Sequence, residues 1–219
     1  LASSAASDVY KRQVLDSFKV QVEKLGYDIT FVNRNLGGRT MTYLEHCHYR
    51  GVDGAVIACV DFNDPQVVEL VNSDVPVVTI DHVFNNRMAV LSDNVAGLKA
   101  LVKQAWACGH RRIAFIHGEK TSVTENRIAG FYQACEELGL EIPEEYVRDG
   151  VYHDVERCAE ETRALLALPQ RPTCIIFPDD FSALGGYNAL AEAGLSIPDD
   201  ISVMGYDAVS YTHLRAHET

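Results

Sequence analysis

Short apolar runs alternate with helical patterns along most of this 219-residue sequence. Apolar residues between the runs recur three and four positions apart, which is the spacing of one helix face. Parallel strands need a crossover connection, so strands that alternate with helices form parallel sheets flanked by helices. The alternation therefore predicts an α/β fold, in which ligands bind beyond the carboxyl ends of the strands.

The first part of the chain contains three helical patterns and four strand-like runs. Asp64 precedes Pro65 and is placed to cap a helix that ends near Val71. The apolar runs 54–60 and 75–80 are typical of strands buried on both faces. Across this part we expect strands at 27–32, 54–60, 75–80 and 88–91, and helices at 14–25, 41–49 and 65–71.

The second part repeats the plan. Asp154 precedes one helical pattern as a cap, and Gly185-Gly186 inside another indicates close packing against a neighbour. Here we expect strands at 112–117, 146–152, 173–177 and 201–206, and helices at 95–107, 128–138, after Asp154, and at 181–193.

The composition excludes several classes of function. A formal net charge of -12 repels phosphate backbones, so these residues should not themselves bind nucleic acid. No stretch approaches the roughly 20 apolar residues that span a bilayer. The six cysteines are scattered without a C-x-x-C pair, which favours reduced thiols and a cytoplasmic protein over a disulfide framework or zinc site.

The two ends differ from the rest. Residues 1–13 and 209–219 show neither helical nor strand periodicity. Both resemble translated sequencing-adapter strings at the ends of unrelated metagenomic reading frames; the alternative is a pair of ordinary disordered tails. We therefore leave both tails out of the fold prediction.

Acidic residues follow three predicted strands, at Asp81, Asp179 and Asp207. Acids at the carboxyl ends of parallel strands indicate a ligand site. The alternative is helix capping, which suits Asp180 well and Asp207 less well.

No sequence pattern predicts a metal, a cofactor or a catalytic group. The sequence lacks a G-x-G-x-x-G, a P-loop and a G-x-S-x-G. His46-Cys47-His48 resembles a ligand cluster, but helix positions i and i+2 point in different directions. A carboxylate pair of the glycosidase kind is conceivable, although nothing singles out an acid with a raised pKa. We therefore expect a binding protein and not an enzyme, with no cofactor and no metal.

Seven motifs, in order, resemble the effector domain of the LacI family of bacterial transcription regulators. The strongest is Gly109-His110-Arg111-Arg112-Ile113-Ala114-Phe115-Ile116. The others are Arg50-Gly51-Val52-Asp53-Gly54, Val75-Pro76-Val77-Val78-Thr79-Ile80-Asp81, Ser92-Asp93-Asn94 with Gly97, Arg127-Ile128-Ala129-Gly130-Phe131, Asp179-Asp180 with Ala183-Leu184-Gly185, and Ile197 to Asp207.

The resemblance implies two Rossmann-like lobes of the periplasmic-binding-protein-like type, truncated at both ends. The lobes would be residues 14–92, incomplete, and 93–208, with the crossing near Ser92. The family's DNA-binding head, hinge helix and first effector-domain strand have no counterpart in this sequence. The family often has Asn where Asp179 stands.

The resemblance also implies which residues line the effector cleft. Arg127 and Asp207 are the leading candidates as a clamp on sugar hydroxyls; the alternative for Arg127 is a surface ion pair with Glu125 or Glu136. Stacking by Tyr152 competes with ordinary core packing. The full predicted set is Asp81, Ser92, Asp93, Thr121, Arg127, Tyr152, Asp179, Phe181 and Asp207.

As a function, the resemblance implies the sensor of a transcription regulator that responds to a small-molecule effector, a sugar above all. The full-length protein would be a homodimer that binds operator DNA through an N-terminal domain, with no membrane partner. The alternatives are a periplasmic sugar-binding protein that serves an ABC transporter, and a carbohydrate-active enzyme.

Overall fold

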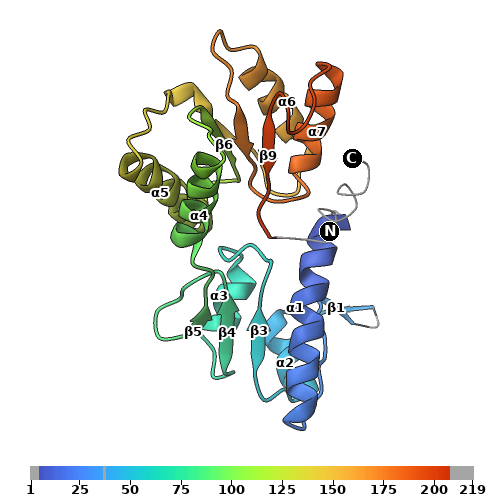
Figure 1. Cartoon of the computed structure of the whole chain (residues 1–219). Helices are drawn as coiled ribbons and strands as arrows, with labels where there is room; N and C mark the ends of the chain where they lie inside the picture. Colours follow the sequence, from blue (N-terminus) through green and yellow to red (C-terminus); the bar gives the residue numbers. More distant parts are fainter. Residues whose placement is uncertain (1–4, 37, 208–219) are drawn as a thin grey trace. The chain divides into compact units, whose positions relative to one another are not determined.

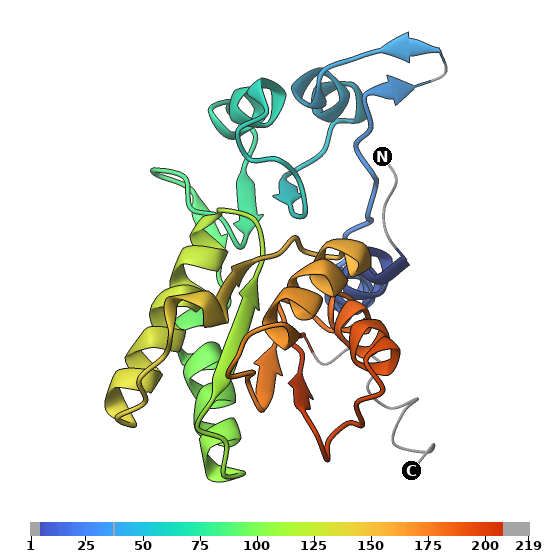
Figure 2. The ribbon, with the colours of Figure 1, turned by 90° about the horizontal axis from the view of Figure 1, so that it is seen from above.

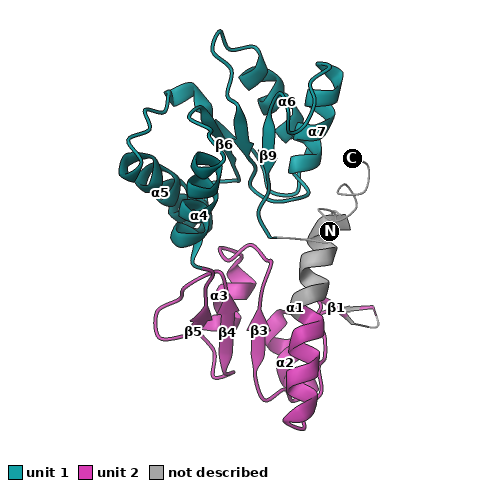
Figure 3. Cartoon of the chain, viewed as in Figure 1, with its two compact units in different colours: residues 1–12, 93–219 teal, residues 13–92 magenta. Residues whose placement is uncertain are grey.

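The computed structural model describes residues 5–36 and 38–207. The chain divides into two compact units, one of residues 1–12 and 93–219 (unit 1) and one of residues 13–92 (unit 2), shown in Figure 3. In the described residues, no helix is long and apolar enough to cross a membrane.

Unit 1 is built on a four-stranded sheet in which every neighbouring pair is parallel. The strand order is β7-β6-β8-β9, so the chain reverses direction along the sheet after β7. The strands are β6 (Ile113–His117), β7 (Val147–Asp149), β8 (Cys174–Ile176) and β9 (Ser202–Met204).

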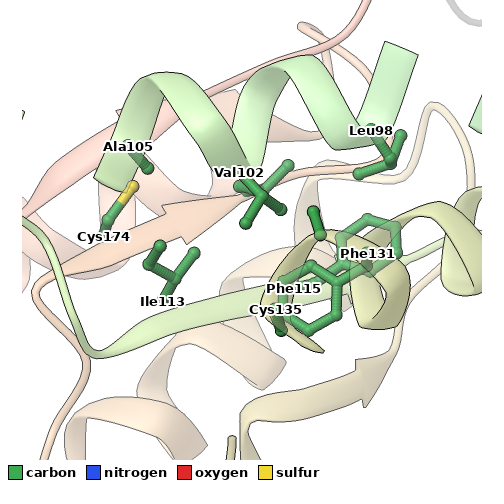
Figure 4. Close-up of a cluster of buried hydrophobic side chains, with 10 residues drawn as sticks. Leu98, Val102, Ala105, Ile113, Phe115, Phe131, Cys135 and Cys174 are labelled. Carbon is green, nitrogen blue, oxygen red and sulfur yellow. The ribbon is translucent and has the colours of Figure 1, made fainter. Parts of the chain in front are cut away.

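Helices cover both faces of this sheet, as Figures 1 and 2 show. Alternate residues of β6 enter two cores: Ile113 and Phe115 pack with one helix pair, and Ala114 and Ile116 with the other. Figure 4 shows the first core, in which Phe131 lies beside Phe115. The first pair is α4 (Asn94–Ala107) and α5 (Ser122–Glu137), and the second is α6 (Val155–Leu166) and α7 (Ala183–Glu192); a short 3-10 helix, η1 (Glu144–Tyr146), precedes β7.

The second helix pair packs closely because of Gly185. A Cβ atom at this position would collide with the carbonyl oxygen of Val155 on α6, and one at Gly186 would collide with the ring of Phe177. The expectation that this glycine pair permits close packing is confirmed.

Unit 2 contains a parallel three-stranded sheet in the order β3-β4-β5. Its core joins Ile57 and Val77 of the sheet to Cys47 of α2 and Val67 of α3. The Asp64 side chain caps α3 by accepting from the amide of Gln66, as the sequence predicts. The elements are the part of α1 (Ala5–Lys24) from residue 13 on, a hairpin of β1 (Asn35–Leu36) and β2 (Arg39–Thr40), α2 (Tyr43–Arg50), β3 (Ala55–Ile57), α3 (Pro65–Val71), β4 (Val77–Ile80) and β5 (Met88–Val90).

Two predictions for unit 2 are wrong. Residues 27–32 form no strand, because a strand needs a neighbour and none of the described strands pairs with them. Strand β3 is not buried on both faces: Val56 is 45% exposed, whereas Ile57 faces α2 and α3 and is 7% exposed. Only the face toward these helices has an apolar layer against it in the described part of the unit.

The N-terminal helix begins earlier than expected. Helix α1 starts at Ala5, so residues 5–13 of the expected tail are helical. Once a helix is nucleated, each added residue gains one backbone hydrogen bond without needing an apolar face. The expected tail at 209–219 lies outside the residues described, and so does the side-chain packing of residues 1–13.

Candidate functional site

The loops at the carboxyl edge of the unit 1 sheet carry most of the predicted site residues. Thr121 lies between β6 and α5, and Tyr152 between β7 and α6. Asp179 lies between β8 and α7, and Asp207 follows β9. This is the edge at which parallel α/β sheets bind ligands.

Arg127 lies in the second turn of α5 and is buried, with 7% of its surface exposed. Its Nε donates to Oδ1 of Asn94 at 2.9 Å, and its Nη1 donates to the carbonyl oxygen of Pro178 at 2.6 Å. Its guanidinium carbon lies 3.7 Å from the ring centroid of Tyr206 and 5.5 Å from that of Tyr152. Arg127 is therefore not a surface residue paired with Glu125 or Glu136.

Both tyrosine rings rest on glycines. A Cβ atom at Gly97 of α4 would collide with the Tyr206 hydroxyl, and one at Gly118, just after β6, would collide with the Tyr152 ring. Any side chain larger than that of glycine at position 97 or 118 would therefore collide with Tyr206 or Tyr152. This fixes the two aromatic faces beside Arg127.

Tyr152 is also held by hydrogen bonds. Its hydroxyl is hydrogen-bonded to the Thr124 hydroxyl at 2.9 Å, and its backbone amide donates to Oε2 of Glu119 at 2.9 Å. Burial raises the pKa of Tyr152 and outweighs the opposing effect of Arg127. Thr121 caps α5 by accepting from the Thr124 amide at 3.2 Å, so its hydroxyl has a structural partner.

Asp179 is an almost fully buried carboxylate, with 2% exposure. Its Oδ1 accepts from the Ser182 amide at 2.8 Å, and its Oδ2 accepts from the Ser182 hydroxyl at 2.8 Å and the His153 amide at 2.9 Å. Burial alone would raise the pKa of Asp179, but the His153 and Ser182 donors outweigh it and lower the pKa. Asp179, and not Asp180, for which capping was the alternative, supplies the carboxylate at the start of α7.

The His153 side chain forms an ion pair with this carboxylate. Its Nδ1 lies 3.4 Å from Oδ1 of Asp179, an ion-pair distance at which the geometry of a hydrogen bond is not met. Asp179 raises the pKa of His153 most; burial opposes the shift, and Asp207 and Glu119 add to it. Three carboxylates from three strand ends therefore act on one imidazole.

Two further predicted residues of unit 1 make local contacts at the starts of helices. Asp93 caps α4 by accepting from the Ala96 amide at 3.0 Å. Phe181 is half-buried just before α7, where its carbonyl accepts from the Leu184 amide at 3.0 Å.

Asp81 and Ser92 lie together in unit 2. Oδ1 of Asp81 accepts from both the amide and the hydroxyl of Ser92 at 3.1 Å. Asp81 has a φ of 60°, which directs the chain sharply away from β4. Next to it, His82 stacks on Phe62 with ring centroids 4.3 Å apart.

Several residues of the cluster were absent from the predicted set, namely Asn94, Glu119, Thr124, His153, Ser182 and Tyr206. Asn94 and Tyr206 lie inside motifs that the sequence analysis singled out, but their long-range contacts to Arg127 leave no local signal. His153 has a φ of 58°, which a sequence does not show.

The three-residue run at 46–48 forms no shared centre. His46 is buried, with Nδ1 2.8–3.0 Å from the backbone of Asn33 and Nε2 accepting from Arg50 at 3.3 Å. His48 lies 3.4 Å from Asp74. Among the described residues, no group of three or more His, Cys, Asp or Glu side chains could hold a metal ion.

Comparison with known proteins places this arrangement in context. Residues 102–216 match the periplasmic binding protein-like domain family. The chain is 30% identical over 205 residues to the HTH-type transcriptional repressor PurR of Mannheimia succiniciproducens, covering 91% of this chain and 61% of the repressor. It is 28% identical over 215 residues to the ribose operon repressor of Haemophilus influenzae, covering 95% and 64%.

Solved structures agree with these matches. A LacI-family regulatory protein from Chloroflexus aggregans is 30% identical, with a TM-score of 0.68, over 77% of this chain and 62% of that one. A LacI-family regulator from Enterococcus faecium with bound ribose shares the fold at 22% identity, with a TM-score of 0.78, over 97% and 78%. The chain spans about three-fifths of the length of the curated repressors it matches first.

Proposed function

The chain belongs to the periplasmic binding protein-like domain family, in the form found in LacI-family regulators, and from this premise we propose that it senses a small-molecule effector for a transcription regulator. The observation that carries the proposal is the cluster around Arg127 and Asp179 at the carboxyl edge of the unit 1 sheet. It combines carboxylates, a guanidinium and two tyrosine faces, which suit hydroxyl groups and the apolar side of a sugar ring.

A sugar is the effector we propose. The names of two relatives support it, since one is a ribose operon repressor and another was solved with bound ribose. Asp207 and Arg127 remain our proposed clamp. Asp81, Ser92, Asp93, Thr121, Tyr152, Asp179 and Phe181 remain proposed contacts.

In the full-length protein we propose a homodimer that binds operator DNA through a separate domain. Effector binding would shift the population between two arrangements of the lobes, and thereby change DNA affinity. Relatives named as repressors and regulators support this over a transporter's binding protein or an enzyme. The six cysteines form no disulfide, which supports a cytoplasmic location.

Calorimetry on this chain with ribose and a panel of other sugars tests the proposal. We expect saturable binding of one sugar without turnover, weakened roughly tenfold or more in Arg127→Ala, because a charged hydrogen bond contributes about 1.5–3 kcal/mol. Arg127→Lys keeps the positive charge and serves as the second variant if Arg127→Ala does not fold. Arg163→Ala on α6 is the matched control, since Arg163 pairs with Glu192 on the exposed surface. Normal affinity with a lowered Tm in Arg127→Ala would make Arg127 purely structural.

A further inference from the structure

The loop of residues 150–154, between β7 and α6, is held by carboxylates from two other loops. The amide of Tyr152 donates at 2.9 Å to Oε2 of Glu119, which lies on the loop after β6. The amide of His153 donates at 2.9 Å to Oδ2 of Asp179, which lies on the loop after β8. The placement of Tyr152 therefore depends on groups outside its own loop.

His153 occupies a backbone conformation that needs support. Its φ of 58° lies in the left-handed region, which residues other than glycine rarely adopt. Such a conformation persists only where the surrounding contacts stabilise it. Asp179 supplies two of these contacts, because its Oδ2 accepts from the His153 amide and its Oδ1 lies 3.4 Å from Nδ1 of the His153 ring. The electrostatic attraction to the ring requires a protonated imidazole, whereas the amide hydrogen bond does not.

The charged groups around this ring come from three other segments and from its own loop. Asp179 raises the pKa of His153 most, burial opposes the shift, and Asp207 and Glu119 add to it. Asp154, the neighbour on the same loop, caps α6. Because the pKa is raised from 6.5, the ring is charged below that value and loses its charge as the pH rises through the folded-state value.

We propose that His153 is a pH-dependent positioning residue: its protonated ring holds the loop 150–154 against Asp179, and loss of the proton loosens this loop together with Tyr152. The Tyr152 ring packs over Gly118, and its centroid lies 5.5 Å from the guanidinium carbon of Arg127. A looser loop therefore places this aromatic face less firmly beside Arg127. The resulting fall in effector affinity at high pH rests on the proposed function, whereas the loosening of the loop is a property of the chain alone.

Hydrogen exchange followed by NMR tests the proposal on the chain without any effector. The exchange rates of the Tyr152 and His153 amides are measured from about pH 5.5 to about pH 8.5 and corrected for the intrinsic rate at each pH. We expect their protection to fall several-fold as the pH rises, by more than that of the buried strand β6, because the opening is local. Protection of the two amides that is independent of pH, or that only follows β6, overturns the proposal.

A substitution assigns the effect to the ring. His153→Asn removes the imidazole, and asparagine adopts a positive φ more readily than most residues. In this variant we expect the two amides to exchange at about pH 5.5 as they do in the wild type at about pH 8.5, without further dependence on pH. His48→Asn is the matched control, because Nε2 of His48 also lies 3.4 Å from a carboxylate, that of Asp74, but in unit 2.

His117 is the competing histidine at this edge, since its Nε2 lies 3.2 Å from Oδ1 of Asp149 at the end of β7. His117→Asn should keep the pH dependence of the loop, and its loss there but not in His153→Asn overturns the proposal. The ring protons of His153 provide a measurement that needs no substitution. Their NMR titration and the change in loop protection should share one midpoint, and two separate midpoints would show that another group controls the loop. Because no effector is present, these outcomes are independent of the proposed function.

Discussion

The guanidinium carbon of Arg127 lies 3.7 Å from the centroid of the Tyr206 ring. This contact joins α5 to the end of β9, and the bonds of Arg127 to Asn94 and Pro178 extend it to α4 and the β8–α7 loop. One side chain thus ties together four segments at the proposed effector edge. Its guanidinium is bound by protein groups, so Arg127 contributes to stability beside the effector role that we propose for it.

Replacing Arg127 by alanine should lower the free energy of unfolding by about 2–4 kcal/mol. The change removes two charged hydrogen bonds and a cation–π contact from a buried position. Urea denaturation followed by circular dichroism measures it. Arg163→Ala should leave stability nearly unchanged, because exposed ion pairs contribute little. Equal effects of the two variants would contradict the buried network.

The Asp179–His153 pair should make stability depend on pH. The pKa of Asp179 is lowered from 3.8, so its contribution is present above about pH 4 and is lost as the pH falls through the folded-state value. The pKa of His153 is raised from 6.5, so its contribution is complete below that value and is lost as the pH rises through the folded-state value.

The wild-type advantage over Asp179→Asn should therefore be largest between about pH 4 and 6.5 and decline on both sides. Thermal unfolding at several pH values measures it. His153→Gln serves as the second variant and should remove the decline at high pH. An advantage that stays the same from pH 3 to pH 9 would show that the ion pair contributes nothing.

Thiol labelling should separate the cysteines into two classes. Cys59 and Cys108 are exposed and should react first with iodoacetamide at pH 8. Burial raises the pKa of Cys135 and Cys158 to about 11 and that of Cys174 to about 12, which suppresses their thiolates. Mass spectrometry after short exposure should find two modified residues, and six after denaturation. Early labelling of Cys174 would contradict the described core.

Gly185→Ala should destabilise the protein, although alanine favours helices by about 1 kcal/mol. The added methyl collides with the Val155 carbonyl and forces α6 and α7 apart, and overpacking of this kind costs about 1–3 kcal/mol. Asn188→Ala, at an exposed position of the same helix, should be neutral or slightly stabilising. Chemical denaturation measures the free energy of unfolding of both variants. A Gly185→Ala variant more stable than wild type would show that α6 and α7 leave room for a methyl group.

This chain alone should bind no operator duplex specifically. Its net charge of -12 opposes contact with phosphates. Fluorescence anisotropy with labelled duplexes at low and high salt measures this. Tight, salt-sensitive binding to one sequence would place a DNA-binding surface within these residues.

Local chemistry made some elements predictable from the sequence. Asp64 and Pro65 mark the start of α3 because capping and a preset φ act within one turn. Asp154 marks the start of α6 by capping alone, since its side chain accepts from the Arg157 amide. The strand predicted at 27–32 was wrong because residues that favour strands form one only beside a partner strand, and composition does not show whether a partner is present.

The site was predictable in its location and less so in its contacts. Strand-end acids indicated the carboxyl edge, and the family resemblance indicated Arg127. The burial of Arg127 depends on a carbonyl 51 residues away, at Pro178, and no periodicity encodes that pairing. His153 was not predicted because its ion pair is with Asp179, which lies after a different strand and 26 residues further along the chain.

The glycine beneath Tyr206 has a mechanical consequence. Gly97 lies in the first turns of α4, four residues after Asp93, where the chain leaves unit 2, and the Tyr206 hydroxyl fills the space that a side chain would occupy. Because the Tyr206 ring packs directly against the backbone at Gly97, the end of β9 cannot shift toward α4 without displacing the start of that helix. Any displacement of the Tyr206 ring toward Gly97 would therefore press on the first turns of α4.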